Sequence, residues 1–378
     1  MSDVSPLTTP STGPGTAPAT VDVDIHIADT PEALLPFIDL PWQRAVAEPT
    51  ANPPWSIHGT LYPSLAAPRP GATPARTPEE VAAYLAAEGI DAGIVLPTAI
   101  MKIGVLPTAD YAVALARAYN RWLASAWLGH GGGVFGAIIV APHDPAEAAR
   151  EIASYVGNPR IAGVLLPMGG VDPLWGDRKY DPIYAAAVTA GLPVILHGGN
   201  DLLLPGTTNL TPLFTSRFEQ HAMSQPLVAM ANLVAMVGTG LFARYPELRV
   251  VFLDAGISWF THIVLRMDKE YNENRRDIPY FTDRPSKYLQ RQVWLGTHPL
   301  ESTQRPEEFG ALVAIANGVE RLLYGSNWPY PDRDAPGRVA AALPDAVIRG
   351  QVMGGNAAAL FNLDVASVGR AAAPTGRV

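Results

Sequence analysis

The 378-residue sequence predicts a (β/α)8 barrel, the TIM-barrel class of α/β protein. Short apolar runs alternate with stretches of helical periodicity, which is the pattern of a parallel sheet with a helix after each strand. Hydrophobic residues make up 48% of the chain, enough for a large core without disulfides, and the sequence contains no cysteine. No glycine-rich dinucleotide-binding motif follows the first apolar run, which disfavours an open nucleotide-binding sheet.

Eight apolar runs are predicted as the strands. Continuously apolar runs of this length are typical of strands that are covered on both faces. Eight strand and helix pairs over roughly 340 residues match a closed barrel with insertions. The predicted strands are Val21–His26, Ala92–Pro97, Val134–Pro142, Ile161–Pro167, Leu192–His197, Leu248–Asp254, Val293–Thr297 and Arg321–Ser326.

Two of the helices between these strands have clear start signals. Thr77 and Asp144 are each followed by proline and, three residues on, by glutamate, which is the pattern of a capped helix start. Helical periodicity is found in Val81–Ala87, Tyr111–Leu128, Ala148–Tyr155, Ile183–Ala190, Pro226–Phe242 and Phe309–Ala316.

The ends of the chain and two connections stand apart from this pattern. Residues 1–20 are rich in Ser, Thr, Pro, Gly and Ala and have no basic residue, so we expect a disordered tail and not a secretory signal. The barrel is expected over residues 21–365, followed by a flexible C-terminal tail over 366–378. Pro41 to Arg76 and Asn200 to Ser224 are expected to form long loops at the C-terminal mouth, where barrel enzymes keep their chemistry.

The charge composition limits the partners. The formal net charge is −8, from 27 basic and 35 acidic residues without a long run of either sign, which disfavours nucleic-acid binding. No apolar stretch approaches the roughly 20 residues of a membrane span. We expect a cytoplasmic protein that acts on a small molecule and has no nucleic-acid or membrane partner, and the sequence leaves a homodimer open.

Four polar residues at predicted strand ends are candidates for a metal site. Asp24 and His26 share one face of the first strand, because side chains alternate along a strand. His197 ends the fifth strand and Asp254 ends the sixth. Each residue alone has a structural explanation: a buried Asp–His pair, a core histidine or a helix cap. Their convergence from three strands favours a divalent cation.

With these residues, the sequence resembles the amidohydrolase-2 family, which includes aminocarboxymuconate semialdehyde decarboxylase, gamma-resorcylate decarboxylase and related hydrolases. The resemblance covers roughly Asp22 to Leu363, and it depends on the order and spacing of several modest motifs. They are Val23–His26, Tyr180–Tyr184, Leu192–His197, Phe242–Phe252, Gly325–Pro329 and Gly355–Phe361.

The resemblance implies a metal held by residues of strands one, five and eight, with a strand-six histidine as acid or base. Asp24, His26 and His197 match the first three ligands. The expected strand-eight aspartate is Asn327, and the expected strand-six histidine is Asp254. The oxygen of Asn327 can still ligate a hard cation but cannot act as a base, which leaves Asp254 as the candidate acid or base. Zn²⁺ is the expected metal, with Mn²⁺ or Fe²⁺ as alternatives and a metal-free barrel left open.

Further residues near the predicted mouth are candidates for substrate binding. Loop packing is the competing explanation for several of them, and a surface ion pair with Asp268 or Glu270 competes for Arg266. The candidates are Trp55, Arg266, His298, Trp328 and Tyr330.

Three functions are compatible with these residues. The leading hypothesis is a hydrolase in which metal-activated water attacks a small cyclic or carboxylated substrate, with Asp254 and Asn327 as its catalytic side chains. The alternative is a carboxy-lyase that acts on a cyclic or aromatic acid. The third is a metal-free barrel with a binding or cyclisation role, which Asn327 favours.

Overall fold

Eight parallel strands follow one another around a single sheet in the order in which they occur in the chain, as predicted. The computed structural model describes residues 19–47, 73–130, 132–198, 216–301, 306–315, 318–343 and 345–365. Residues 1–18 and 366–378 of the predicted tails and the loop residue Trp55 lie outside these residues. The strands are β1 (Val21–Ile27), β2 (Ala92–Pro97), β3 (Val134–Ile139), β4 (Ile161–Pro167), β5 (Val194–His197), β6 (Val250–Leu253), β7 (Val293–Gly296) and β8 (Leu322–Leu323).

The sheet closes between its first strand and the segment that follows its last strand. The backbone N–H of Val23 donates to the carbonyl of Tyr324 at 3.0 Å, and that of His26 donates to the carbonyl of Trp328 at 2.8 Å. Ile25 and Trp328 form a parallel bridge at the same place. These contacts make the nearly closed barrel of the (β/α)8 class.

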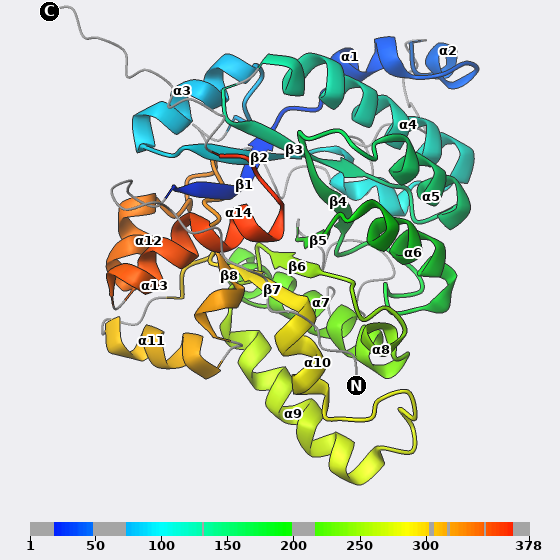
Figure 1. The fold of residues 1–378 in the computed structure, drawn as a ribbon. Helices are drawn as coiled ribbons and strands as arrows, with labels where there is room; N and C mark the ends of the chain where they lie inside the picture. The colour runs from blue at the N-terminus through cyan, green and yellow to red at the C-terminus, as the bar shows by residue number, and fades with distance from the viewer. Residues whose placement is uncertain are drawn as a thin grey trace, which may run out of the picture.

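Helices surround the sheet (Figure 1). Thr77 and Asp144 accept hydrogen bonds at the starts of α3 and α5, which confirms both predicted caps. The helices are α1 (Pro31–Leu34), α2 (Trp42–Ala47), α3 (Pro78–Glu88), α4 (Ala109–Trp122), α5 (Pro145–Ser154), α6 (Asp181–Ala190), α7 (Arg217–Gly238), α8 (Leu241–Arg244), α9 (Ser258–Asn274), α10 (Pro285–Gln292), α11 (Pro306–Ile315), α12 (Pro336–Ala342), α13 (Ala346–Gly350) and α14 (Asn356–Leu360).

Three predicted element boundaries are wrong. The first long loop contains α2, which starts just after Pro41. The predicted helix start at Pro226 is too late, because Ser216 and Glu219 form a reciprocal capping box that begins α7 and leaves Pro226 inside the helix. The same helix ends earlier than predicted, where Gly240 adopts a left-handed φ of 71° between α7 and α8.

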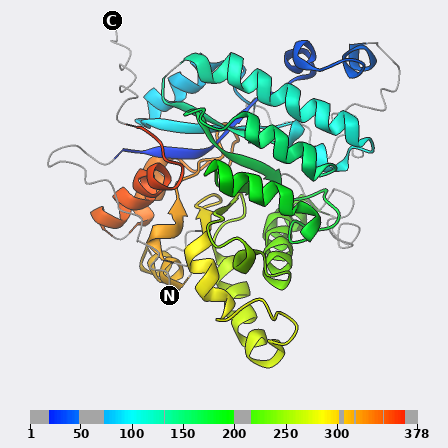
Figure 2. The ribbon, with the colours of Figure 1, turned by 45° about the vertical axis from the view of Figure 1, so that its right-hand side comes forward.

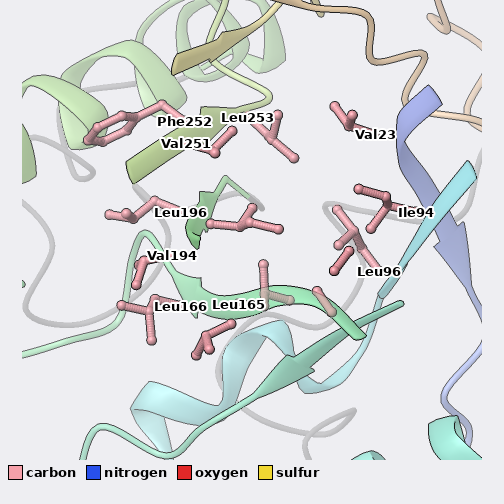
Figure 3. Packing of buried hydrophobic residues seen from close by; sticks show 14 of the residues in the cluster. Val23, Ile94, Leu96, Leu165, Leu166, Val194, Leu196, Val251, Phe252 and Leu253 are labelled. Carbon is pink, nitrogen blue, oxygen red and sulfur yellow. The ribbon is translucent and has the colours of Figure 1, made fainter. Parts of the chain in front are cut away.

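The apolar side chains of the strands are almost fully buried. Figure 3 shows this packing at close range. The labelled side chains include Val23 of β1, Ile94 and Leu96 of β2, Leu165 of β4 and Leu196 of β5. Each such side chain stabilises the fold by about 1.5–3 kcal/mol relative to its exposed state. The strand ends therefore form a rigid frame for the polar residues beyond them.

The outer helices differ in how closely they follow the barrel. In Figure 1 α9 and α10 extend away from it, and in Figure 2 α1 and α2 lie at the edge of the molecule beside the end of α4. Within the described residues, none of the helices combines the length and apolar character that a bilayer crossing requires.

Candidate active site

Three buried side chains from β1 and β5 meet at the C-terminal ends of the strands. Asp24 and His26 share one face of β1, and His197 is the last residue of β5. The Nε2 atom of His197 lies 3.0 Å from Oδ1 of Asp24, and Nε2 of His26 lies 3.4 Å from the same oxygen. All three offer a ligand atom within 4.8 Å of the others. The structure thus brings together the ligands predicted from strands one and five.

Backbone carbonyls set the orientation of both imidazole rings. The Nδ1 atom of His26 donates to the carbonyl of Pro97 at 3.2 Å, and Nδ1 of His197 donates to the carbonyl of Gly198. A carbonyl can only accept, so each Nδ1 carries a hydrogen. Nε2 of His197 donates to Oδ1 of Asp24 while the ring is protonated, and in a neutral ring the lone pair of Nε2 is left to bind a cation. This arrangement is typical of histidines that bind a metal through Nε2.

Two atoms of this cluster lack the partner that burial requires. Oδ2 of Asp24 and Nε2 of His26 are buried and have no hydrogen-bond partner among the described residues. A buried unsatisfied polar atom costs about 1–3 kcal/mol. A divalent cation would satisfy both atoms, and a carboxylate with two imidazoles is a suitable donor set. The residues present therefore fit a metal.

The electrostatics of the cluster keep its carboxylate ionised. Burial alone would raise the pKa of Asp24, but His197 and His26 together hold it well below its usual range. Burial alone would lower the pKa of His197, but Asp24, with a contribution from Asp254, raises it to about 9. A metal ligand must be deprotonated, so a cation competes with a proton at His197.

Asp254 stands directly after β6, in a left-handed backbone conformation with φ of 55°. Burial raises its pKa, and the nearby His197 and His298 oppose that effect. Its Oδ1 atom lies 3.6 Å from Nε2 of His298. Asp254 therefore reaches the same region as the metal-ligand candidates, as a carboxyl group that holds its proton more strongly than usual.

The turn that carries Asp254 is fastened to the loop after β7. The N–H of Gly256 donates to the carbonyl of His298 at 3.1 Å. The carboxylate of Glu301 accepts from the N–H groups of Ile257 and Ser258 at 2.9 and 2.7 Å. Gly256 has φ of 69°, and a Cβ atom there would meet this carboxylate at 2.7 Å. Glycine is therefore required at this position.

His298 is a buried part of the site and is paired with Asp334. Its Nδ1 atom lies 2.8 Å from Oδ2 of Asp334, which also accepts from the N–H of Leu300 at 2.7 Å. Burial alone would lower the pKa of His298, but the hydrogen bond to Asp334 and the charge of Asp254 raise it. Asp334 is not among the residues predicted from the sequence, although an acidic residue in the loop after strand eight is a usable signal.

Asn327 contacts His298 and also has a left-handed backbone, with φ of 59°. Its Nδ2 atom lies 2.9 Å from Nε2 of His298. The amide nitrogen is thus committed to this histidine, while the predicted ligation of a metal by Asn327 remains a prediction.

The other predicted substrate-binding residues have different surroundings. The ring of Tyr330 lies 5.0 Å from that of His26, and burial raises the pKa of its phenol to about 12. Trp328 instead stacks on Tyr84 of α3, with ring centroids 4.4 Å apart. Arg266 lies on α9 with its side chain 60% exposed, paired with Glu270 at 2.8 Å. Of these three side chains, only the ring of Tyr330 is in contact with a metal-ligand candidate.

A second buried carboxyl group supports the site from β1. Asp22 accepts from the N–H of Asp24 at 3.1 Å, from that of Ser326 at 3.0 Å and from the hydroxyl of Tyr84 at 2.9 Å. Burial raises its pKa to about 7. Asp22 is not among the site residues predicted from the sequence, although it precedes Asp24 by one strand period. It joins β1 to the segment after β8 directly beside the candidate ligands.

The family model described as amidohydrolase matches residues 21–363. No curated protein matches the sequence.

Solved structures resemble the chain at low sequence identity over nearly its full length. An amidohydrolase from Mycobacterium avium subsp. paratuberculosis K-10 is 20% identical, with a TM-score of 0.71 over 92% of this chain and 100% of that chain. A 5-carboxyvanillate decarboxylase from Sphingomonas paucimobilis is 21% identical, with the same TM-score of 0.71 and the same coverage of 92% and 100%. A dihydroxybenzoic acid decarboxylase from Polaromonas sp. JS666, with bound manganese and 2-nitroresorcinol, is 18% identical, with a TM-score of 0.63 over 91% of this chain and 97% of that chain.

Proposed function

The chain belongs to the amidohydrolase family, and we propose that it is a metal-dependent carboxy-lyase of a small cyclic or aromatic carboxylic acid. Two of the similar solved structures are described as decarboxylases of aromatic acids, one of them with manganese bound. This makes decarboxylation, our alternative from the sequence, the leading proposal in place of hydrolysis.

The observation that carries the proposal is the buried cluster of Asp24, His26 and His197, with its two unpartnered atoms. We propose these residues as the protein ligands of a divalent cation. Manganese is the first candidate and zinc the second. When bound, the cation would hold the carboxylate of the substrate and withdraw electron density from it. The polar residues around the cluster would orient the acid and supply a proton.

The side chains beyond the cluster favour a lyase over a hydrolase. Hydrolysis needs a base that takes a proton from water, whereas decarboxylation needs an acid that gives a proton to carbon. The amide of Asn327 cannot take a proton. Burial raises the pKa of Asp254, which favours its protonated form. The protonated form of Asp254 thus suits proton donation.

Hydrolysis remains a second candidate because of Asp254. Its carboxyl group lies close to His298, and in its ionised form it would be a base for water at the same mouth. A metal-free binding or cyclisation role is the remaining alternative, since the family's expected acidic ligand is replaced by Asn327.

Elemental analysis followed by a substrate panel tests the proposal. We expect near-stoichiometric metal in the purified protein and none in the His26→Ala/His197→Ala variant. The panel pairs hydroxylated benzoic acids with amides and lactones of similar size, and CO₂ release and hydrolysis are both recorded. Metal-dependent CO₂ release supports the proposal. Hydrolysis without CO₂ release supports the second candidate, and wild-type protein without metal supports the third.

A further inference from the structure

His26, the candidate ligand near the end of β1, is oriented by a peptide group that a buried carboxylate holds. Nδ1 of His26 donates to the carbonyl of Pro97, and Asp29 accepts from the N–H of Thr98, which belongs to the same peptide. We propose that Asp29 is a positioning residue of the metal centre and acts on His26 through this peptide. The inference rests on the metal centre of the proposed function and deepens it.

Asp29 lies two residues beyond β1 and is only 2% exposed. Its Oδ1 atom accepts from the N–H groups of Thr98 and Ala99 at 2.7 and 2.8 Å. Its Oδ2 atom accepts from the N–H of Ile100 at 2.6 Å. Short bonds of this kind are typical of an ionised acceptor. One carboxylate therefore holds three successive amide groups directly after β2.

The ionised form of Asp29 fits these contacts. Burial raises the pKa of Asp29, and the three N–H groups oppose that rise. A backbone N–H can only donate, so an ionised carboxylate satisfies all three groups, whereas a protonated one would need a further acceptor for its own hydrogen. The negative charge of Asp29 therefore faces the N–H side of the turn after β2.

The planarity of the peptide extends this restraint to His26. The bond between Pro97 and Thr98 is trans, so its N–H and its C=O point in opposite directions. Because Asp29 holds the N–H of Thr98, the carbonyl on the other side is kept toward Nδ1 of His26, 3.2 Å away. The direction of the carbonyl, and with it the tautomer of the imidazole, is thus fixed from the far side of the peptide.

The same peptide also transmits the charge of Asp29. A carboxylate that accepts from a peptide N–H increases the negative charge on the carbonyl oxygen of that peptide, because hydrogen bonds in a chain polarise one another. The oxygen of Pro97 then accepts more strongly from Nδ1 of His26, and Nε2 becomes a better electron-pair donor to a cation. Metal-ligating histidines often donate directly to a carboxylate, and here one peptide group stands between the two.

A second contact holds the same turn to β1. The hydroxyl of Thr98 donates to the carbonyl of Ile27 at 3.0 Å. Ile27 also pairs with Pro97 in the register of β1 and β2. The residues after the first two strands are thereby joined beside the candidate ligands.

His197 provides an internal comparison. Nδ1 of its ring donates to the carbonyl of the next residue, Gly198, and not to the turn after β2. A change at Asp29 is therefore expected to alter His26 more than His197.

The first test needs neither metal nor substrate. Nitrogen-15 NMR of the imidazole rings reports which nitrogen of His26 carries hydrogen, with His26→Gln used to assign its signals. At a pH where the ring is neutral, we expect hydrogen on Nδ1 in the wild type and a larger share of the other tautomer in Asp29→Asn. Unchanged His26 signals in a folded variant would contradict the proposal. A wild-type ring without hydrogen on Nδ1 would overturn it even if the variant failed to fold.

The second test measures the affinity for Zn²⁺ by competition with a chelator at one fixed pH, since Zn²⁺ binds such ligands more tightly than Mn²⁺. We expect Asp29→Asn to bind Zn²⁺ about 10–100-fold more weakly than the wild type, which is the usual effect of losing an outer partner of a metal-ligating histidine.

Asp268→Asn is the matched control for this test. Asp268 accepts from the N–H of Ser286 at 2.9 Å, at the start of α10 and away from the candidate ligands. The control should lower thermal stability and leave the Zn²⁺ affinity unchanged, and a purely structural role of Asp29 would give the same result. His262→Gln, at an exposed position of α9, should match the wild type in both measurements.

The outcomes separate this inference from the proposed function. Equal Zn²⁺ affinity in the wild type and Asp29→Asn overturns the role of Asp29 and leaves the metal centre standing. A wild type that binds no Zn²⁺ overturns the metal centre and the role of Asp29 together. A protein that binds Zn²⁺ as expected but decarboxylates no acid of the panel overturns the proposed reaction and supports the inference, because neither test depends on turnover.

Discussion

The Nε2 atom of His197 lies 3.0 Å from Oδ1 of Asp24, although 173 residues separate the two in the sequence. The contact joins the end of β5 to β1 across the mouth of the barrel, and both side chains are at most 2% exposed. The candidate metal centre therefore exists only in the folded barrel, and folding and metal binding are expected to be linked.

Metal binding should raise thermal stability. A cation at 100 times its dissociation constant stabilises the native state by about 2.7 kcal/mol. We expect Mn²⁺ or Zn²⁺ to raise the Tm of chelator-treated wild type, measured by differential scanning fluorimetry. The His26→Ala/His197→Ala variant should show no such shift, whereas His262→Gln should match the wild type. An equal shift in the double variant would place the metal elsewhere.

Metal affinity should fall as the pH is lowered. The pKa of His197 is raised to about 9, so below that pH a cation must displace a proton from its ring. The apparent affinity should weaken by up to about tenfold for each pH unit below that value. Isothermal titration with Mn²⁺ across this range measures the slope. A pH-independent affinity would contradict ligation by His197.

The metal-free protein should show the opposite dependence in its own stability. Because the folded-state pKa of His197 is raised above the unfolded value, this group stabilises the fold fully below about pH 6.5 and loses its contribution as pH rises through about 9. Urea unfolding of chelator-treated protein at both ends of this range should show lower stability at the high end. His197→Gln should flatten the difference.

Asp22→Ala should destabilise the barrel at its closure. The substitution removes Oδ1, which accepts from the N–H groups of Asp24 and Ser326, and Oδ2, which accepts from the hydroxyl of Tyr84. A buried donor left without a partner costs about 1–3 kcal/mol. Urea unfolding measures the loss, and Asp277→Ala, a substitution of an exposed residue after α9, should change stability by less than about 0.5 kcal/mol. Equal losses of stability in the two variants would contradict a stabilising role for the hydrogen bonds of Asp22.

Asn327→Asp should change the protonation of His298 and leave the metal in place. A carboxylate beside Nε2 of His298 would favour the doubly protonated ring, which nitrogen-15 NMR detects as two N–H groups. Metal content should remain near-stoichiometric in both proteins. Metal found only in the variant would show that the three proposed ligands are insufficient.

The strands and half of the site could be predicted because their signals are local. Each strand is a continuous apolar run, and Asp24, His26 and His197 stand at the ends of such runs. The start of α7 could also be predicted, since Ser216 and Glu219 have capping-box spacing. The predicted start at Pro226 is wrong because proline is more common at the first position of a helix than inside one.

The role of His298 could not be predicted because its partner is not local. Asp334 lies 36 residues further along the chain, and the loop between β8 and α12 brings it to the histidine. The role of Asp22 likewise depends on its hydrogen bonds with Tyr84 and Ser326, and the periodicity of β1 does not predict these partners. The strand period predicts which residues of one strand lie on the same face. Residues of different loops come close only when the barrel closes, so their contacts cannot be predicted from local sequence patterns.

The seam between β1 and the segment after β8 has a consequence for synthesis on the ribosome. The N–H of His26 finds its acceptor in the carbonyl of Trp328, and the N–H of Val23 finds its acceptor in Tyr324. Until those late residues leave the exit tunnel, β1 is an open edge available to other chains. A nascent chain therefore carries Asp24 and His26 on an open strand edge until the segment after β8 has been synthesised.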